Sequence, residues 1–96
     1  MAGERGRILV VDDDDGLREL LVRYLSENGY EATGVPDGAA MKRHLATEPV
    51  DLLLLDVMLP GEDGLTLARA LSALGAPPII MLSARGEEID RIVGLE

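Results

Sequence analysis

Short apolar runs alternate with longer segments of mixed polarity along the chain. Three runs of four consecutive apolar residues occur, at 8–11, 52–55 and 79–82. Runs of this length suit strands that are covered on both faces, as in a parallel sheet. A weaker run at 31–35 predicts an edge strand.

Helical periodicity fills the segments between the apolar runs. Apolar residues recur at the i, i+3, i+4, i+7 spacing of one helix face over 17–25, which predicts a first helix. Asp37 is placed to cap a second helix that Pro49 closes, and 64–74 predicts a third. A fourth helix is predicted from the spacing of three apolar residues near the end of the chain, Ile89, Ile92 and Val93.

The order of the predicted elements is βαβαβαβα, which indicates an α/β fold with a doubly wound parallel sheet. The helical crossovers of such sheets are right-handed almost without exception. We expect residues 1–6 to form a flexible N-terminal tail and residues 7–96 to form one domain. Hydrophobic residues make up 47% of the sequence, enough for one core, and without Phe or Trp that core must be aliphatic.

Charge and the lack of cysteine exclude several classes of function. The net charge is −9, so the chain repels nucleic acid phosphates and is not expected to bind DNA by itself. Without cysteine there are no disulfides or thiolate metal sites, which fits a reducing, cytoplasmic location. The apolar run near the N-terminus is too short for a signal peptide or a membrane span, so no membrane partner is expected.

Acidic and hydroxyl side chains stand at the ends of three predicted strands. Asp12 and Asp13 follow the first, Asp56 follows the third, and Ser83, which alternatively caps a helix, follows the fourth. In open α/β sheets, ligands bind beyond the carboxyl ends of the strands, where strand order reverses. If the first and third strands are neighbours, the three carboxylates converge, and their repulsion favours a hard divalent cation such as Mg²⁺. The same ion can neutralise a phosphoryl group that a carboxylate attacks.

Other polar residues are better explained by structure than by chemistry. Asp14 and Asp15 precede a helix and are expected to cap it and to complement its dipole. His44 has no second histidine or cysteine nearby and is expected at the surface. A calcium-binding loop with Gly16 at its sixth position fails, because valines stand at its first and last positions. The acidic turn after the first strand also lacks the glycines of a phosphate-binding loop.

Three segments contain the candidate residues in a distinctive setting. They are 8–14, which ends in three aspartates; 55–64, in which Asp56 precedes Leu59-Pro60-Gly61; and 78–84, which ends in Ser83-Ala84. Together they resemble the receiver domains of response regulators. The residues at 86–96 favour the OmpR type of transcriptional regulator within that family, so the resemblance covers nearly the whole chain, from 7 to 96.

The resemblance implies a flavodoxin-like receiver fold and a role for each candidate residue. Asp56 would be the phosphoacceptor. Asp13 would bind Mg²⁺ directly and Asp12 largely through water, while Met58 would offer its backbone carbonyl to the metal. Ser83 would be the switch hydroxyl that bonds the phosphoryl group.

The resemblance also implies that part of the fold is missing. The family's fifth strand and fifth helix, with an active-site lysine, would follow Glu96, so we expect strand order 2-1-3-4 and a domain incomplete at its C-terminus. The only lysine, Lys42, lies on the second predicted helix and not at the site. The uncovered fourth strand and sheet face are expected to make the truncated chain self-associate, as a dimer or another assembly.

The leading hypothesis is a signalling module and not an enzyme. The receiver domain would take a phosphoryl group from a sensor histidine kinase and switch an output domain, expected to bind DNA, that this chain lacks. A phosphohydrolase similar to haloacid-dehalogenase-like phosphatases is a rival, because Asp13, Asp15 and Gly16 have its spacing, although Leu17 stands where a hydroxyl residue usually follows. A flavodoxin-type cofactor binder is a third hypothesis, and the acidic first loop argues against a flavin phosphate there.

Overall fold

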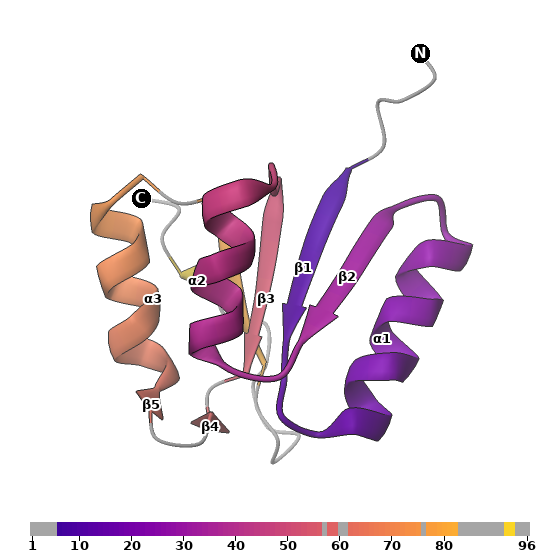
Figure 1. Cartoon of the computed structure of the whole chain (residues 1–96), viewed down its shortest axis with the longest axis horizontal. Helices are drawn as coiled ribbons and strands as arrows, with labels where there is room; N and C mark the ends of the chain where they lie inside the picture. Colours follow the sequence, from indigo (N-terminus) through magenta and orange to yellow (C-terminus); the bar gives the residue numbers. More distant parts are fainter. Residues whose placement is uncertain (1–5, 57, 60–61, 76, 83–91, 94–96) are drawn as a thin grey trace.

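The computed structural model describes residues 6–56, 58–59, 62–75, 77–82 and 92–93. Apart from two short strands at 58–59 and 62–63, strands and helices alternate from the first strand to the third helix, as the apolar pattern predicts (Figure 1). In chain order the elements are β1 (Arg7–Val11), α1 (Asp15–Glu27), β2 (Glu31–Val35), α2 (Gly38–Thr47), β3 (Leu52–Asp56), β4 (Met58–Leu59), β5 (Glu62–Asp63), α3 (Gly64–Ala73), β6 (Ile79–Leu82) and β7 (Ile92–Val93).

The main sheet has the order β2-β1-β3-β6-β7. The first four of these strands are parallel, so the predicted order 2-1-3-4 is confirmed. The register pairs Val11 of β1 with Leu55 of β3, and Asp56 with Leu82 of β6. Strand order therefore reverses beside β1, and the carboxyl ends of β1 and β3 adjoin each other at one edge of the sheet.

The segment around Ile92 and Val93 corrects one prediction. These residues form β7 and pair antiparallel with Ile80 and Ile79 of β6, so the helix predicted there is wrong at both positions, while Ile89 lies outside the described residues. Both are β-branched and suit a strand, and the free edge of β6 offers unpaired backbone groups. The expectation that the fourth parallel strand is a bare edge is therefore also wrong at Ile79 and Ile80.

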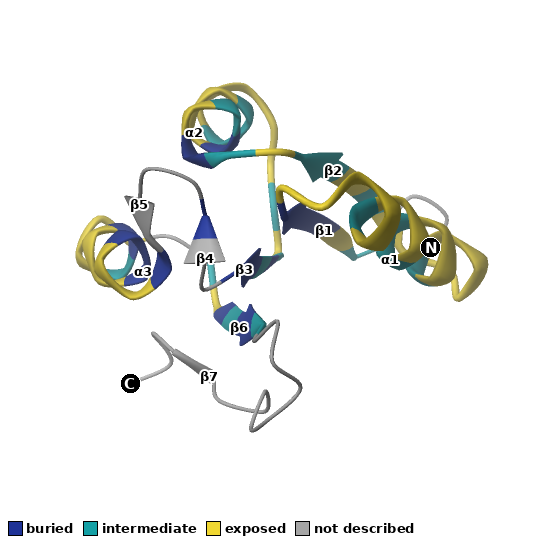
Figure 2. Ribbon diagram, turned by 90° about the horizontal axis from the view of Figure 1, so that it is seen from below, coloured by how far each residue is buried: buried dark blue, intermediate teal, exposed yellow. Residues whose placement is uncertain are grey.

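The two faces of the sheet are covered unequally. Figure 2 shows α1 on one face and α2 with α3 on the other. The buried core lies on the face of α2 and α3, and it is aliphatic as predicted; it comprises Leu9, Val11, Met41, Leu53, Leu55, Leu59, Leu67, Ala68, Leu71, Ile79 and Met81. On the other face, α1 has no fully buried residue, and Leu54 and Ile80 of the sheet are only half-buried.

Helix ends follow the capping signals in the sequence. Asp14 caps α1 by accepting a hydrogen bond from the amide of Leu17 at 3.1 Å, and Asp37 caps α2 through the amide of Ala40 at 2.9 Å. Gly29 and Gly75, which follow α1 and α3, have φ of 93° and 82°, a conformation that other residues adopt at a cost. Among the described residues, no helix combines the length and apolar character needed to cross a membrane.

Candidate functional site

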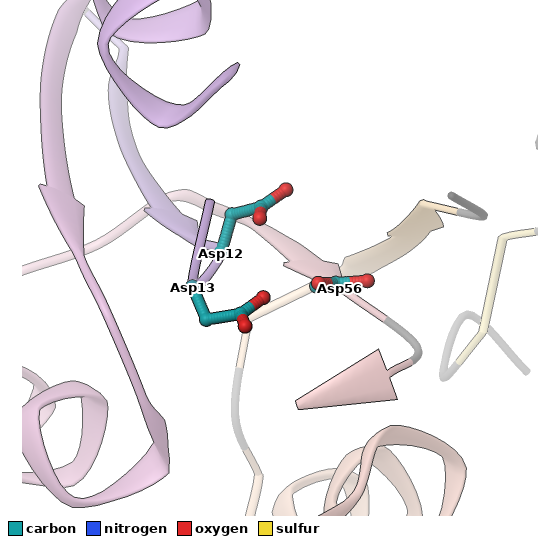
Figure 3. A group of neighbouring side chains, drawn as sticks. All are labelled: Asp12, Asp13 and Asp56. Carbon is teal, nitrogen blue, oxygen red and sulfur yellow. The ribbon is translucent and has the colours of Figure 1, made fainter. Parts of the chain in front are cut away.

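Three carboxylates gather where β1 and β3 end. Asp12 and Asp13 directly follow β1, and Asp56 is the last residue of β3 (Figure 3). One carboxylate oxygen from each lies within 4.8 Å of the others. The sequence-based prediction that these three side chains converge is confirmed, and it follows from the parallel pairing of β1 with β3.

Burial differs sharply within this acidic cluster of Asp12, Asp13 and Asp56. Asp12 is 3% exposed and Asp56 is 5% exposed, whereas Asp13 is exposed at the mouth of the site. Burial raises the pKa of the Asp12 carboxyl, the amide of Asp14 opposes the rise by hydrogen bonding, and the charge of Asp56 adds to it. Two enclosed carboxylates so close together repel each other when both are charged.

Hydrogen bonds fix the loop between β1 and α1. The amide of Asp12 donates to the carbonyl oxygen of Val35 at 3.1 Å, which extends the pairing of β1 with β2 by one residue. The Oδ1 atom of Asp12 accepts from the amide of Asp14 at 2.9 Å, and Asp14 in turn caps α1. The acidic loop is thus part of the helix start, as expected for Asp14, and it also holds Asp12 in place.

The oxygens of the acidic cluster fit a small hard cation. Mg²⁺ prefers oxygen ligands and keeps several of its waters, so a few carboxylates open to solvent on one side suit it. A cation there would offset the repulsion between Asp12 and Asp56 and could bind a phosphoryl oxygen beside a carboxylate nucleophile.

The other predicted residues have separate outcomes. Ser83 lies outside the described residues. The backbone of Met58 is described and begins β4 directly after the site. Lys42 lies away from the acidic cluster, as predicted; it lines a groove with Pro49 and Pro77, which precede β3 and β6 at the opposite end of the sheet. His44 is half-buried on α2 and outside the site.

Two findings concern a rival motif that the sequence left open and a contact that the sequence did not predict. Asp15 is exposed and pairs with Arg18, so the phosphohydrolase motif of Asp13 and Asp15 does not form one cluster. Arg18 also donates to the backbone of Asp12, a contact that was not predicted. The only signal for it in the sequence is a cation placed one helical turn after an acidic loop.

Comparison with known proteins decides the family. The family described as "Response regulator receiver domain" matches residues 8–96. This chain belongs to that family. It is therefore a two-component receiver domain with an acidic site at Asp12, Asp13 and Asp56, and it is a phosphoacceptor signalling module, not a turnover enzyme.

Curated relatives of this receiver domain are OmpR-type transcriptional regulators. It is 48% identical over 95 residues to the transcriptional regulatory protein AruR of Pseudomonas aeruginosa, covering 94% of this chain and 39% of AruR. It is 46% identical over 99 residues to GltR of the same species, covering 100% of this chain and 41% of GltR. The chain thus spans about 40% of the length of these relatives.

A solved structure agrees with the fold. The response regulator TrrA of Thermotoga maritima, solved in complex with Mg²⁺-BeF, superimposes with a TM-score of 0.76 at 38% identity, covering 82% of this chain and 70% of TrrA. The acidic cluster found here is typical of the receiver Mg²⁺ site.

Proposed function

We propose that this receiver domain accepts a phosphoryl group on Asp56 from a sensor histidine kinase and that Mg²⁺ assists the transfer. Asp12, Asp13 and Asp56 would hold the cation together with the backbone carbonyl of Met58. The observation that carries the proposal is the convergence of three carboxylate oxygens within 4.8 Å at the ends of β1 and β3. Family membership adds the class of phosphodonor.

Asp56 is the best placed of the three carboxylates to act as the nucleophile. It is the last residue of β3, it is enclosed at 5% exposure beside the end of β1, and it stands in the 55–64 segment that resembles receiver domains. An oxygen of Asp56 would attack the phosphorus of a phosphohistidine, the phosphorus–nitrogen bond would break, and the imidazole would leave with the bonding pair. The product is an acyl phosphate on Asp56.

Mg²⁺, when bound, supplies charge neutralisation to the phosphoryl oxygens and to the attacking carboxylate. The protein itself contributes by holding the carboxylates of the site in position. Asp12 is held by the amide of Asp14 and by Val35, so its carboxylate is preorganised before any cation or phosphoryl group arrives.

The output of the switch is part of the same proposal. Ser83 would donate its hydroxyl to the new phosphoryl group, and movement at the end of β6 would alter the surface that follows it. AruR and GltR are transcriptional regulatory proteins, so we place a DNA-binding output domain outside the 96 residues of this chain. We also propose a cytoplasmic location for the domain, which membership of the family supports.

Replacement of the nucleophile tests this function. Asp56→Asn should abolish labelling by a small phosphodonor such as acetyl phosphate in the presence of Mg²⁺, followed as a gain in intact mass. Because the only lysine of the sequence, Lys42, lies away from the site, the labelling should be measured in a chain extended by the residues that follow the matched segment in AruR, where the family's fifth strand and helix are expected.

Asp51→Asn is a matched control in the extended chain, because Asp51 is an exposed aspartate just before the same strand. It should be labelled like the unchanged extended chain. Equal labelling of the Asp56→Asn protein would move the nucleophile to another residue and reject the proposal.

A further inference from the structure

Arg18 of α1 reaches from the helix to the loop that carries Asp12 and Asp13. Its Nη1 atom donates to the main-chain carbonyl oxygen of Asp12 at 2.8 Å, and its Nη2 atom pairs with Oδ1 of Asp15. The Arg18 side chain is only 17% exposed, whereas that of Asp15 is 80% exposed. An enclosed guanidinium bonded to a loop carbonyl holds a defined position, unlike a solvated surface charge.

The path of the Arg18 side chain depends on a glycine in the neighbouring strand. A Cβ atom at Gly34 of β2 would lie 2.8 Å from Cγ of Arg18 and 3.0 Å from its Cδ. Val22 of α1 would also be close, at 3.1 Å from its Cγ2. Any side chain at position 34 would therefore push the stem of Arg18 away from the sheet, so this glycine leaves the room that Arg18 needs.

The carbonyl that Arg18 binds belongs to the peptide group joining Asp12 to Asp13. Because a peptide group is planar, fixing its oxygen also fixes the direction in which the chain enters Asp13. The amide of Asp12 is already held by Val35, and its carboxylate by Asp14. Asp13 lies exposed at the mouth of the cluster, so the orientation of its side chain depends on this backbone restraint.

We propose that Arg18 is a positioning residue for the cation site. By holding the peptide between Asp12 and Asp13, it keeps the carboxylate of Asp13 within reach of Asp12 and Asp56. This inference rests on the proposed function, in which these three carboxylates hold Mg²⁺.

Two effects of Arg18 on Mg²⁺ affinity have opposite signs, which makes the proposal testable. A positive charge near the site repels a cation, so loss of that charge alone would tighten binding. Loss of the restraint on the loop would weaken it. Because Arg18 is paired with Asp15, the charge effect is largely balanced, and we expect the restraint to dominate. Outer residues that orient metal ligands change affinity by about tenfold or more.

The experiment is a Mg²⁺ titration of the 96-residue protein, followed by backbone amide shifts in NMR spectra. Arg18→Met keeps the apolar stem and removes the guanidinium, and it should raise the Kd for Mg²⁺ by about tenfold. Arg18→Lys keeps one donor and the charge, and it should restore part of the affinity. Arg23→Met removes the same charge from an exposed position further along α1 and should bind Mg²⁺ like the unchanged protein.

Gly34→Ala is a second variant that displaces Arg18 without removing it, and it decides the matter if Arg18→Met does not fold. It should also weaken Mg²⁺ binding. A role in helix stability alone would lower the unfolding temperature of these variants and leave the Kd unchanged. If the unchanged protein binds Mg²⁺ at the three aspartates and the Arg18 variant binds it as tightly or more tightly, the role of Arg18 is rejected and the proposed function stands. If the unchanged protein shows no shifts at these aspartates, both are rejected.

Discussion

Asp56→Asn should stabilise the metal-free protein, because it removes one of two enclosed like charges. Asp12 and Asp56 are 3% and 5% exposed, and their carboxylate oxygens lie within 4.8 Å of each other. Two unit charges at that separation repel by about 3 kcal/mol at an effective dielectric constant of about 20. The cluster opens to water at Asp13 and salt screens it, so we expect a net gain of about 1–2 kcal/mol in the free energy of unfolding.

The sign of the pH dependence follows from Asp12. Burial raises its pKa above the ordinary 3.8, and the charge of Asp56 adds to the rise. An acid whose pKa is higher in the folded than in the unfolded state stabilises the fold fully only below the unfolded pKa, and this contribution is lost as pH rises through the folded pKa. At neutral pH the repulsion is therefore fully present and the variant gains most. Toward pH 3.8 Asp12 takes up its proton, and the two proteins should converge.

Thermal unfolding followed by circular dichroism measures this gain. The expected free energy corresponds to a rise in Tm of roughly 5–10 °C for a domain of this size, at neutral pH with EDTA. Mg²⁺ should narrow the gap, because the variant has lost a ligand and gains less from binding. Asp51→Asn removes an exposed charge at the other end of β3, where the carboxylate accepts a hydrogen bond from the amide of Arg7 at 2.8 Å; the Asn side-chain oxygen can keep this bond, so Tm should change little. A Tm for Asp56→Asn at or below that of the unchanged protein in EDTA would refute the reasoning.

Three further predictions concern the fold and its surface. Met41→Ala empties a fully buried core position and should cost about 2–5 kcal/mol in urea unfolding, and a loss below about 1 kcal/mol would contradict the core assignment. Asp14→Ala removes the cap of α1 and should cost about 1 kcal/mol by the same assay, whereas an unchanged midpoint would contradict it. The chain should self-associate through the side of the sheet that α1 covers, where Leu20 and Tyr24 of α1 are 57% and 61% exposed. Leu20→Glu should therefore shift the chain toward monomer in light scattering after gel filtration. A monomeric unchanged protein at concentrations on the order of tens of micromolar would oppose this.

The sequence was sufficient for the elements that depend on local pattern. The apolar runs at 8–11, 52–55 and 79–82 predicted β1, β3 and β6, because strands buried on both faces have few polar positions. The convergence of Asp12 and Asp56 followed from one topological rule, that ligands gather where parallel strand order reverses. Neither inference needed side-chain detail.

Features that depend on contacts between residues far apart in the sequence could not be predicted from local pattern. Ile92 and Val93 fit a helical spacing locally, yet they pair with Ile79 and Ile80, and the free edge of β6 is visible only once the sheet is assembled. In the sequence, Arg18 stands three residues after Asp15, a spacing typical of an ion pair on the surface of a helix. Its bond to the carbonyl of Asp12 requires the open space at Gly34, which lies on another strand.

Location of the phosphoryl group on the chain tests the central claim most directly. The chain, extended by a fifth strand and helix, should be incubated with acetyl phosphate and Mg²⁺ and then reduced with borohydride, which converts an aspartyl phosphate to homoserine. Tandem mass spectrometry of the peptides then identifies the modified position. The account predicts homoserine at position 56, dependent on Mg²⁺ and absent when EDTA is added. Homoserine at position 12 or 13 in place of 56, or none in the extended chain, would contradict it.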